Sequence, residues 1–183
     1  MRIISGKHKG RRVELSKEAS AVVRPTSDFA REAIFNILAH SDLGTSGHPF
    51  MDKDVADICC GTGALGLEAL SRGAKHVTFV DKSREALANA HHNTEKMHES
   101  AHADFIQADS TKLPRARRPY AVIFLDPPYF LNLVAPALQS LRDGGWLTPE
   151  GIVFVEHGDK EKIAFPSGYT QLDQRRYGRA VIN

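Results

Sequence analysis

The sequence lacks most of the features that mark secreted and membrane proteins. Among its 183 residues only Cys59 and Cys60 are cysteines, and because they are neighbours a strain-free disulfide between them is not expected. The amino-terminal residues carry no apolar core of the kind found in signal peptides. The most apolar region, from Tyr120 to Leu138, is interrupted by Asp126 and three prolines and cannot cross a bilayer as one helix. We therefore expect a cytoplasmic protein with no membrane partner.

A strong net charge is also absent, since 24 Lys and Arg residues nearly balance 22 Asp and Glu residues to give a net charge of +2. The basic residues are nevertheless unevenly distributed. Residues 1–25 hold seven of them against two acidic residues, and two more clusters follow at Lys112, Arg115, Arg117 and Arg118 and at Arg175, Arg176 and Arg179. A solvated basic face is a sufficient explanation for any one cluster. Three clusters on one side of the fold would suit a polyanion such as nucleic acid.

Metal-ligand patterns are missing, although the sequence holds nine histidines. His91, His92 and His98 lie along one predicted helix, without cysteine or aspartate residues at the spacing of a metal site. We therefore expect no metal centre.

The chain length fits one α/β domain that needs no disulfide to be stable. From Val55 onward, strand and helix patterns alternate, which predicts a doubly wound sheet. The predicted strands are residues 55–59, 75–81, 105–108, 120–125 and 152–156, and the predicted helices are residues 64–72, 83–98 and 133–142, the last able to kink at Pro136. Residues 169–177 and 179–182 are expected to close the sheet as an antiparallel hairpin.

Residues 1–40 are expected to form an extension of the same globule, and residues 41–183 the sheet domain. A β-hairpin is predicted over residues 2–15, with a basic, glycine-rich tip that could equally well contact phosphates or protect a sheet edge. Residues 24–28 have the composition of a helix start, and apolar residues then follow a helical period to about His40.

A glycine-rich loop follows the first predicted strand of the sheet domain. Gly61, Gly63 and Gly66 satisfy the dinucleotide-binding fingerprint, and Asp81 lies twenty residues after Gly61, where that fingerprint expects a ribose contact. However, Asp57 stands just before the glycines, where a pyrophosphate would place negative charge beside a carboxylate. S-adenosylmethionine has no phosphate and carries a sulfonium and an ammonium group. The loop therefore favours S-adenosylmethionine over a dinucleotide.

Acidic residues end four successive predicted strands, at Asp57, Asp81, Asp109 and Asp126. Ligands of open α/β sheets bind at this edge. Asp81 could accept hydrogen bonds from both ribose hydroxyls, and Asp109, with Ser110 beside it, could accept one from the adenine amino group. Each acid alone could instead be a helix cap or a solvated turn. Their joint occurrence favours a methyltransferase.

The sequence Asp126-Pro127-Pro128-Tyr129 ends the strand that contains the apolar run from Val122 to Leu125. The Asp126 carboxylate and the Pro127 carbonyl could together accept the two hydrogens of an exocyclic base amine and direct its lone pair at a methyl donor. Tyr129, with help from Phe130, could stack on a base that has been flipped out of a helix. The simpler alternative is a proline turn with a surface tyrosine.

These motifs resemble those of the bacterial RsmD-type methyltransferases, which modify guanine N2 in 16S ribosomal RNA. The resemblance spans nearly the whole chain and rests on residues 2–6, 9–11, 24–28, 31–36, 57–74, 126–129, 155–157 and 177–178. It implies a seven-stranded methyltransferase sheet, S-adenosylmethionine as methyl donor, and a small ribosomal subunit, rather than bare RNA, as substrate. It also implies that Arg24 and Thr26 belong to a segment that folds over the cofactor.

Candidate RNA-binding residues come from the first two basic clusters: Lys7, Lys9, Arg11, Arg12, Arg115, Arg117 and Arg118. We expect the protein to be a monomer. Two other functions stay open at this point. Adenine-N6 methyltransferases of DNA or RNA share the Asp-Pro-Pro-Tyr sequence, and a non-catalytic ribosome assembly factor could keep the cofactor for structural reasons.

Overall fold

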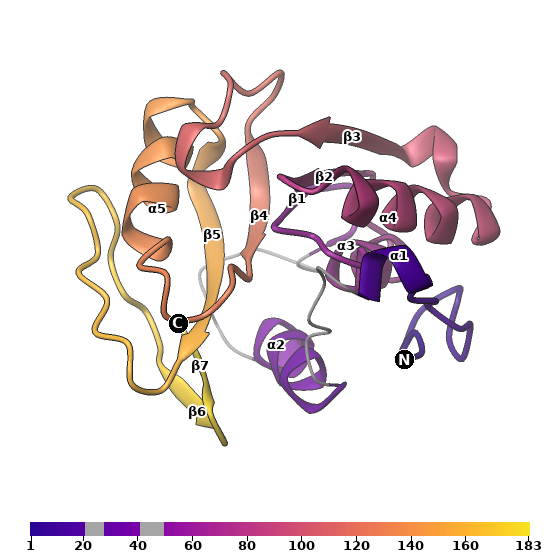
Figure 1. The fold of residues 1–183 in the computed structure, drawn as a ribbon, viewed down its shortest axis with the longest axis horizontal. Coiled ribbons are helices and arrows are strands. Elements are labelled where there is room, and N and C mark those ends of the chain that lie inside the picture. Colours follow the sequence, from indigo (N-terminus) through magenta and orange to yellow (C-terminus); the bar gives the residue numbers. More distant parts are fainter. Residues whose placement is uncertain (21–27, 41–49) are drawn as a thin grey trace.

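The structure, a computed structural model, describes residues 1–20, 28–40 and 50–183. It contains one seven-stranded sheet with helices on both faces (Figure 1). The strands are β1 (Asp54–Ile58), β2 (His76–Asp81), β3 (Ala103–Gln107), β4 (Tyr120–Leu125), β5 (Leu147–Gly158), β6 (Arg175–Tyr177) and β7 (Ala180–Ile182). The helices are α1 (Lys17–Ser20), α2 (Asp28–His40), α3 (Ala64–Ser71), α4 (Arg84–Lys96) and α5 (Val134–Asp143), with short 3₁₀ turns η1 (Ser100–His102) and η2 (Ser110–Lys112).

The strand order is β3-β2-β1-β4-β5-β7-β6. Strands β1 to β5 are parallel, whereas β7 pairs antiparallel with both β5 and β6. The predicted doubly wound sheet with an antiparallel carboxyl-terminal hairpin is therefore confirmed. The order reverses between β1 and β4, which creates the crevice where such sheets bind ligands.

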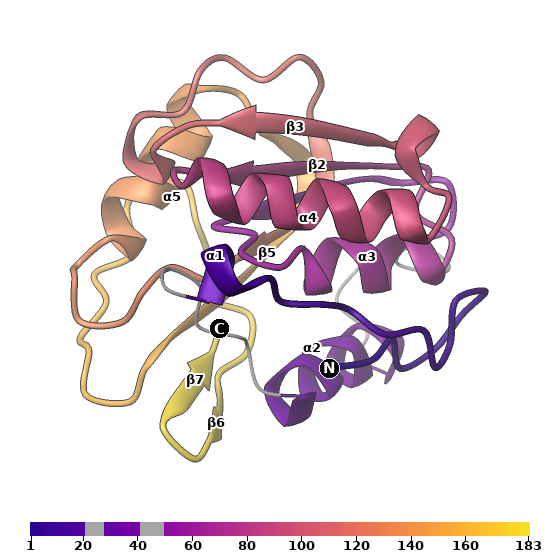
Figure 2. The ribbon, with the colours of Figure 1, turned by 45° about the vertical axis from the view of Figure 1, so that its right-hand side comes forward.

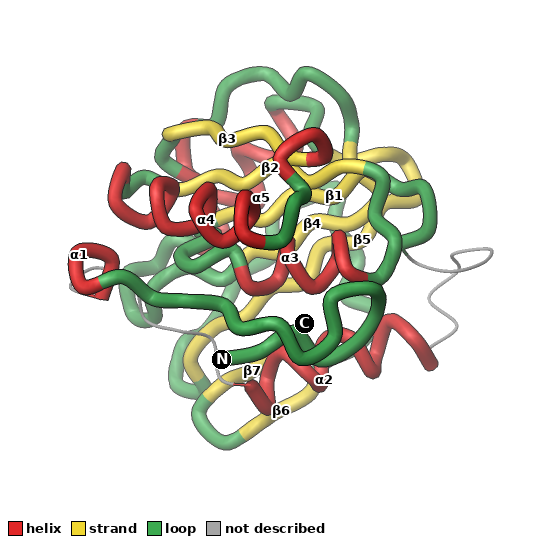
Figure 3. Tube along the Cα trace, turned by 90° about the vertical axis from the view of Figure 1, so that its right-hand side faces the viewer, coloured by secondary structure: helices red, strands yellow, loops and turns green. Residues whose placement is uncertain are grey.

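Two apolar layers enclose the sheet. On one face Val77, Phe79 and Phe124 pack against α2, α3 and α4. On the other face Ile123 and Leu125 pack against α5 and the buried Trp146. Figure 3 shows α3 and α4 together on one side of the sheet, with the amino-terminal segment lying along them. Residues 1–16 and α2 contribute side chains to the same core as the sheet.

Some predicted boundaries were wrong. Strand β5 begins five residues earlier than predicted, and the hairpin strand before Gly178 is only three residues long. Pro136 is the third residue of α5, where backbone N–H groups have no partner within the helix, so the proline has no reason to kink it. Helix α1 was not predicted, although Ser16 at its start accepts a hydrogen bond from Ala19 N as a helix cap does.

The predicted amino-terminal hairpin is mostly not a β-ladder. Its strands share a single antiparallel bridge between Arg2 and Arg12. Buried side chains of α3 take the place of the missing strand partners, because Glu68 accepts hydrogen bonds from Ile4 N at 2.7 Å and from Ser5 N at 3.0 Å. The segment is thus held against the helices rather than extended away from them (Figure 2).

None of the helices in the described part of the chain has the length and apolar character needed to span a bilayer.

Gly66 is the point of closest approach between α3 and the sheet. A Cβ atom there would lie 2.3 Å from Phe79 Cε1 and 2.8 Å from Val77 Cγ1. Alanine is favoured over glycine in a helix by about 1 kcal/mol, but overpacking a rigid core costs about 1–3 kcal/mol. We therefore expect Gly66→Ala to lower the free energy of unfolding, measured by urea denaturation. An increase in stability would show that the Phe79 ring can move aside with little loss of packing energy.

Candidate active site

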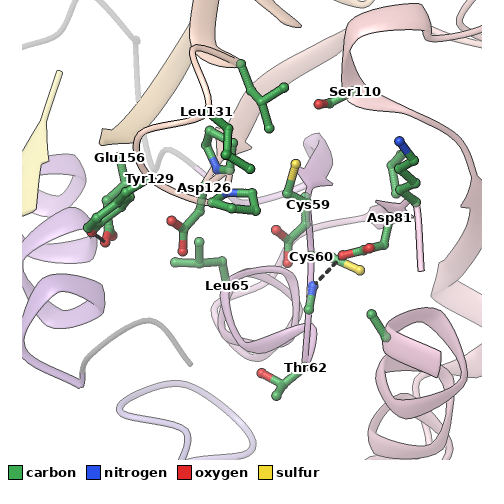
Figure 4. A pocket seen from close by; sticks show the side chains of 18 of the residues that line it. Cys59, Cys60, Thr62, Leu65, Asp81, Ser110, Asp126, Tyr129, Leu131 and Glu156 are labelled. Carbon is green, nitrogen blue, oxygen red and sulfur yellow. Dashed lines mark hydrogen bonds between the residues drawn. The ribbon is translucent and has the colours of Figure 1, made fainter. Parts of the chain in front are cut away.

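An acidic cavity with a volume of about 760 Å³ opens at the carboxyl edge of the sheet. Its lining includes all four predicted strand-end acids, Asp57, Asp81, Asp109 and Asp126, together with Glu156 at the corresponding end of β5. Figure 4 shows Asp126 between the pair formed by Tyr129 and Glu156 on one side and Cys59 and Asp81 on the other. The structure therefore brings together the residues predicted for cofactor and base.

Strand register explains why these acids share one cavity. Asp57 is paired with Phe79 on β2 and with Phe124 on β4. Asp81 and Asp126 each follow those phenylalanines by two residues, and side chains alternate along a strand. All three carboxylates therefore project from the face that α3 covers, at the end of the strands where α3 begins.

The same acids hold the glycine loop in place. Gly63 is in the left-handed region, with φ 78°, and its N–H donates to the Cys60 carbonyl at 2.7 Å. Gly61 N donates to Asp81 Oδ2 at 3.0 Å, and Gly66 N donates to Asp57 Oδ2 at 2.9 Å. The loop is thereby fixed before any ligand binds.

Asp57 and Asp109 differ strongly in their acidity. Asp57 is 1% exposed, and burial raises its pKa to about 7, although the Gly66 N–H lowers it, and Asp81 adds a smaller rise. In contrast, hydrogen bonds from the Thr111 N–H and hydroxyl, followed by the Lys82 ammonium, lower the pKa of Asp109 to about 2. Asp109 caps η2, so the capping alternative applies to it even though it also lines the cavity.

The two cysteines are free. Cys59 lines the cavity with φ 62°, and burial raises the pKa of its thiol to about 12. Burial also raises the pKa of Cys60 well above its ordinary value. Both thiols are therefore protonated at neutral pH and poorly nucleophilic.

The loop after β4 is fixed by two glutamates. The Tyr129 hydroxyl donates a hydrogen bond to Glu156 Oε1. Glu161 accepts from Phe130 N at 2.8 Å and from Gly158 N at 2.7 Å. Phe130 has φ 63°, which is unusual for a residue other than glycine and is often found at functional sites. This loop therefore holds its aromatic residues in one arrangement.

The basic residues predicted to bind RNA lie away from the cavity. Lys7 pairs with Glu99 at 2.7 Å, just beyond the carboxyl end of α4. An Arg11 guanidinium N–H donates to the carbonyl of Lys96, the last residue of α4. The cavity borders α4 near its amino-terminal end, at Ala86, and it also includes Thr62, whose carbonyl accepts a hydrogen bond from Asn93 Nδ2 at 3.1 Å. Figure 2 shows the loop of the amino-terminal segment on the side away from the β2 and β3 arrowheads.

Arg118 is also distant from the cavity. It contacts Asp54 at 3.5 Å and Asp104 at 3.3 Å, near the amino-terminal ends of β1 and β3. Arg118 and the catalytic candidates therefore lie at opposite ends of the strands. Arg115 and Arg117 precede it on the same connection, between η2 and β4.

Sequence reasoning missed several cavity residues: Glu156, Leu131, Tyr177 and Arg179. Leu131 is 60% exposed beside the equally exposed Phe130. In the sequence, the third basic cluster, at Arg175, Arg176 and Arg179, was the signal that could have indicated that the carboxyl-terminal hairpin contributes to the site. Arg24 and Thr26 lie outside the described residues. Within the described ranges, no three His, Cys, Asp or Glu side chains gather in a way that could hold a metal ion.

The raised pKa of Asp57 gives a testable pH dependence. Between its ordinary value of 3.8 and about 7, the folded protein retains a proton that the unfolded chain has released. Stability must therefore fall as pH rises through this window and level off above it, by roughly 1 kcal/mol per pH unit.

Asp57→Asn keeps an oxygen that can accept the hydrogen bond from Gly66 N but has no titratable group. We therefore expect this variant to lack the loss of stability with rising pH that Asp57 causes. Urea unfolding of both proteins at pH 5, 6, 7 and 8 measures it. Parallel stability curves for the two proteins would show that Asp57 is already ionised at pH 5.

Comparison with known proteins agrees with this geometry. The model of the family described as conserved hypothetical protein 95 matches residues 1–183. Ribosomal RNA small subunit methyltransferase D of Haemophilus influenzae is 31% identical over 183 residues, which cover 97% of this chain and 89% of that protein. The protein of the same name from Escherichia coli strain K12 is 32% identical over 157 residues, which cover 85% of this chain and 74% of that protein.

Two solved structures share the fold over almost the whole chain. The yhhF protein from Escherichia coli superimposes with a TM-score of 0.80 at 27% identity, covering 100% of this chain and 94% of that one. HI0767 from Haemophilus influenzae gives a TM-score of 0.75 at 28% identity, covering 99% and 94%. The chain therefore belongs to the conserved hypothetical protein 95 family, the RsmD-type methyltransferases, and has their Rossmann-like fold.

Proposed function

We propose that this protein transfers a methyl group from S-adenosylmethionine to the exocyclic N2 amine of a guanine in 16S rRNA of the small ribosomal subunit. The observation that carries the proposal is the single cavity that joins the acid-braced glycine loop to Asp126, Pro127 and Tyr129. Family membership supports it, because relatives named ribosomal RNA small subunit methyltransferase D match most of the chain.

The chemistry of the cavity fits this cofactor. A volume of about 760 Å³ lies within the usual range for small-molecule sites. Asp57 suits the cationic methionine end, Asp81 the ribose hydroxyls, and Asp109 with Ser110 the adenine amine. Gly61 and Gly63 let the backbone approach the ligand closely. From the family resemblance, we assign Arg24 and Thr26 to the segment that covers the cofactor.

S-adenosylmethionine, when bound, supplies an electrophilic methyl group on a positively charged sulfur. The lone pair of a guanine amine is delocalised into the ring, so the protein must make it available. In our proposal the Asp126 carboxylate and the Pro127 carbonyl accept the two amine hydrogens, which favours a pyramidal nitrogen. The Asp126 carboxylate also stabilises the positive charge that develops on this nitrogen, until a proton leaves.

The cavity mouth suits a flipped base. In our proposal Tyr129 stacks on the base. Phe130 and Leu131, 59% and 60% exposed, also line the cavity. Apolar side chains of this kind can fill the gap that a flipped base leaves in a helix. Arg179 borders the same cavity, where it could contact a flanking phosphate.

Asp126→Ala tests the catalytic assignment. We expect methyl transfer to fall by about 10²–10³-fold, as when one donor or acceptor of a preorganised site is removed. Cofactor affinity should change by less than about threefold, because cofactor and amine use different acids. Radiolabel transfer to small subunits and calorimetric titration with S-adenosylmethionine measure the two effects.

Asp109→Ala is the matched control, because it removes another carboxylate from the same cavity. We expect it to weaken cofactor binding more than Asp126→Ala does. Equal losses of transfer and cofactor binding in the Asp126 variant would contradict the assignment. If the wild-type protein labelled only adenine, the result would instead favour an adenine-N6 enzyme. If the wild-type protein bound the cofactor without any transfer, the result would favour an assembly factor.

The proposed distant RNA contacts give a second test. Replacing Lys7, Lys9, Arg11 and Arg12 together with glutamine should weaken small-subunit binding and flatten its salt dependence, by about 0.7–0.9 in log–log slope per lost phosphate contact. A short RNA that contains only the target nucleotide and its immediate neighbours offers fewer phosphates to these residues, so the change in its salt dependence should be smaller. Filter binding over a salt series measures both. An unchanged slope with whole subunits would give these residues a purely structural role.

A further inference from the structure

Glu156 stands beside Asp126 at the end of the sheet. Leu125 and Val155 are paired across β4 and β5, so the next residues, Asp126 and Glu156, are neighbours on strands that lie about 4.8 Å apart. Both residues project from the face that carries Phe124 and Phe154. Glu156 is only 5% exposed and lines the cavity, so little of its side chain is in contact with bulk solvent.

Glu156 is also held in position from two sides. Its backbone is fixed in the sheet between β4 and β7, where it is paired with Ile182. Its Oε1 atom accepts a hydrogen bond from the Tyr129 hydroxyl, and Figure 4 shows the two side chains together on one side of Asp126. A base that stacks on Tyr129 and presents its amine to Asp126 can therefore place its Watson–Crick edge next to Glu156.

Nucleobases differ at the ring nitrogen next to the exocyclic amine. In guanine the amine lies between two ring nitrogens: N1, on the Watson–Crick edge, carries a hydrogen and is a donor, whereas N3 is an acceptor. In adenine and in cytosine the corresponding nitrogen is an acceptor with a lone pair. A carboxylate at this point can accept a hydrogen bond from guanine but repels the lone pair of the other two bases.

We propose that Glu156 accepts the N1–H of the target guanine and so excludes bases that lack this hydrogen. This inference rests on the proposed function and adds the group that selects the base. A carboxylate has about four lone-pair sites, so the bond from Tyr129 leaves acceptor capacity for a second donor. Tyr129 thus has two functions, since its ring stacks on the base and its hydroxyl orients the carboxylate.

A purely structural role is the competing explanation, in which Glu156 does no more than hold Tyr129. The two roles differ in their response to the base. A structural glutamate affects all bases equally when it is replaced, whereas a selective glutamate changes the preference between bases.

2-Aminopurine separates these roles, because it keeps the N2 amine of guanine but has a lone pair at N1. Small subunits are reconstituted with 16S rRNA that carries either guanine or 2-aminopurine at the nucleotide that the wild-type protein methylates, mapped beforehand by mass spectrometry. We expect the wild type to prefer guanine by at least about 100-fold in kcat/KM, because a buried acceptor without its donor is costly.

Glu156→Gln should reduce this preference to less than about tenfold, since its amide can donate to N1 of 2-aminopurine and no longer repels it. Tyr129→Phe, which removes only the hydroxyl, should slow transfer to both bases and keep most of the preference for guanine. Glu150→Gln makes the same chemical change at an exposed position of β5 and should keep the full preference. Cofactor titration verifies that each variant is folded.

The outcomes separate the two levels of the proposal. Equal wild-type rates on the two bases, or an unchanged preference in a folded Glu156→Gln variant, would overturn the role of Glu156 while leaving guanine methylation intact. If Glu156→Gln fails to fold, the wild-type comparison still tests the proposal, because equal rates on the two bases would overturn it. A wild type that modifies no guanine N2 in small subunits would refute the proposed function itself.

Discussion

Side-chain alternation along parallel strands is the constraint on which this site depends. Asp57, Asp81, Asp126 and Glu156 occupy alternate positions that face α3, while the residues between them face α5. A shift of one residue in any strand would send its carboxylate to the opposite layer. The apolar residues that fix the register, such as Phe79 and Phe124, therefore also determine which acids meet in the cavity.

The cavity combines carboxylates whose pKa values are shifted in opposite directions. Asp57 is buried and its pKa is raised, whereas Asp109 is stabilised as an anion by Thr111 and Lys82. A buried carboxylate is costly to ionise without a partner, so a cationic ligand that reached Asp57 would relieve this cost. This arrangement suits a charged, phosphate-free cofactor better than a dinucleotide, and it gives a physical reason for an acid just before a glycine loop.

The amino-terminal extension shows that charge in a sequence does not by itself identify the residues that border the cavity. Its backbone is bound by Glu68, and Lys7 is paired with Glu99. Arg118 is likewise paired at the edge opposite the cavity. Arg179, in the cluster that sequence reasoning did not select, is instead found at the cavity mouth. Proximity to the reacting base is decided by the path of the chain over the sheet.

The sequence by itself determined the class of fold, the order of its strands and helices along the chain, and most of the candidate site. These features follow from local patterns: apolar runs ended by acids, glycines at a strand-to-helix turn, and two prolines after Asp126. It could not determine that Glu156 lies beside Asp126, that the carboxyl-terminal hairpin borders the cavity, or that Lys7 and Arg11 contact Glu99 and Lys96 instead of lining the cavity. Those relations depend on strand pairing and helix docking between distant segments, which only the folded chain fixes.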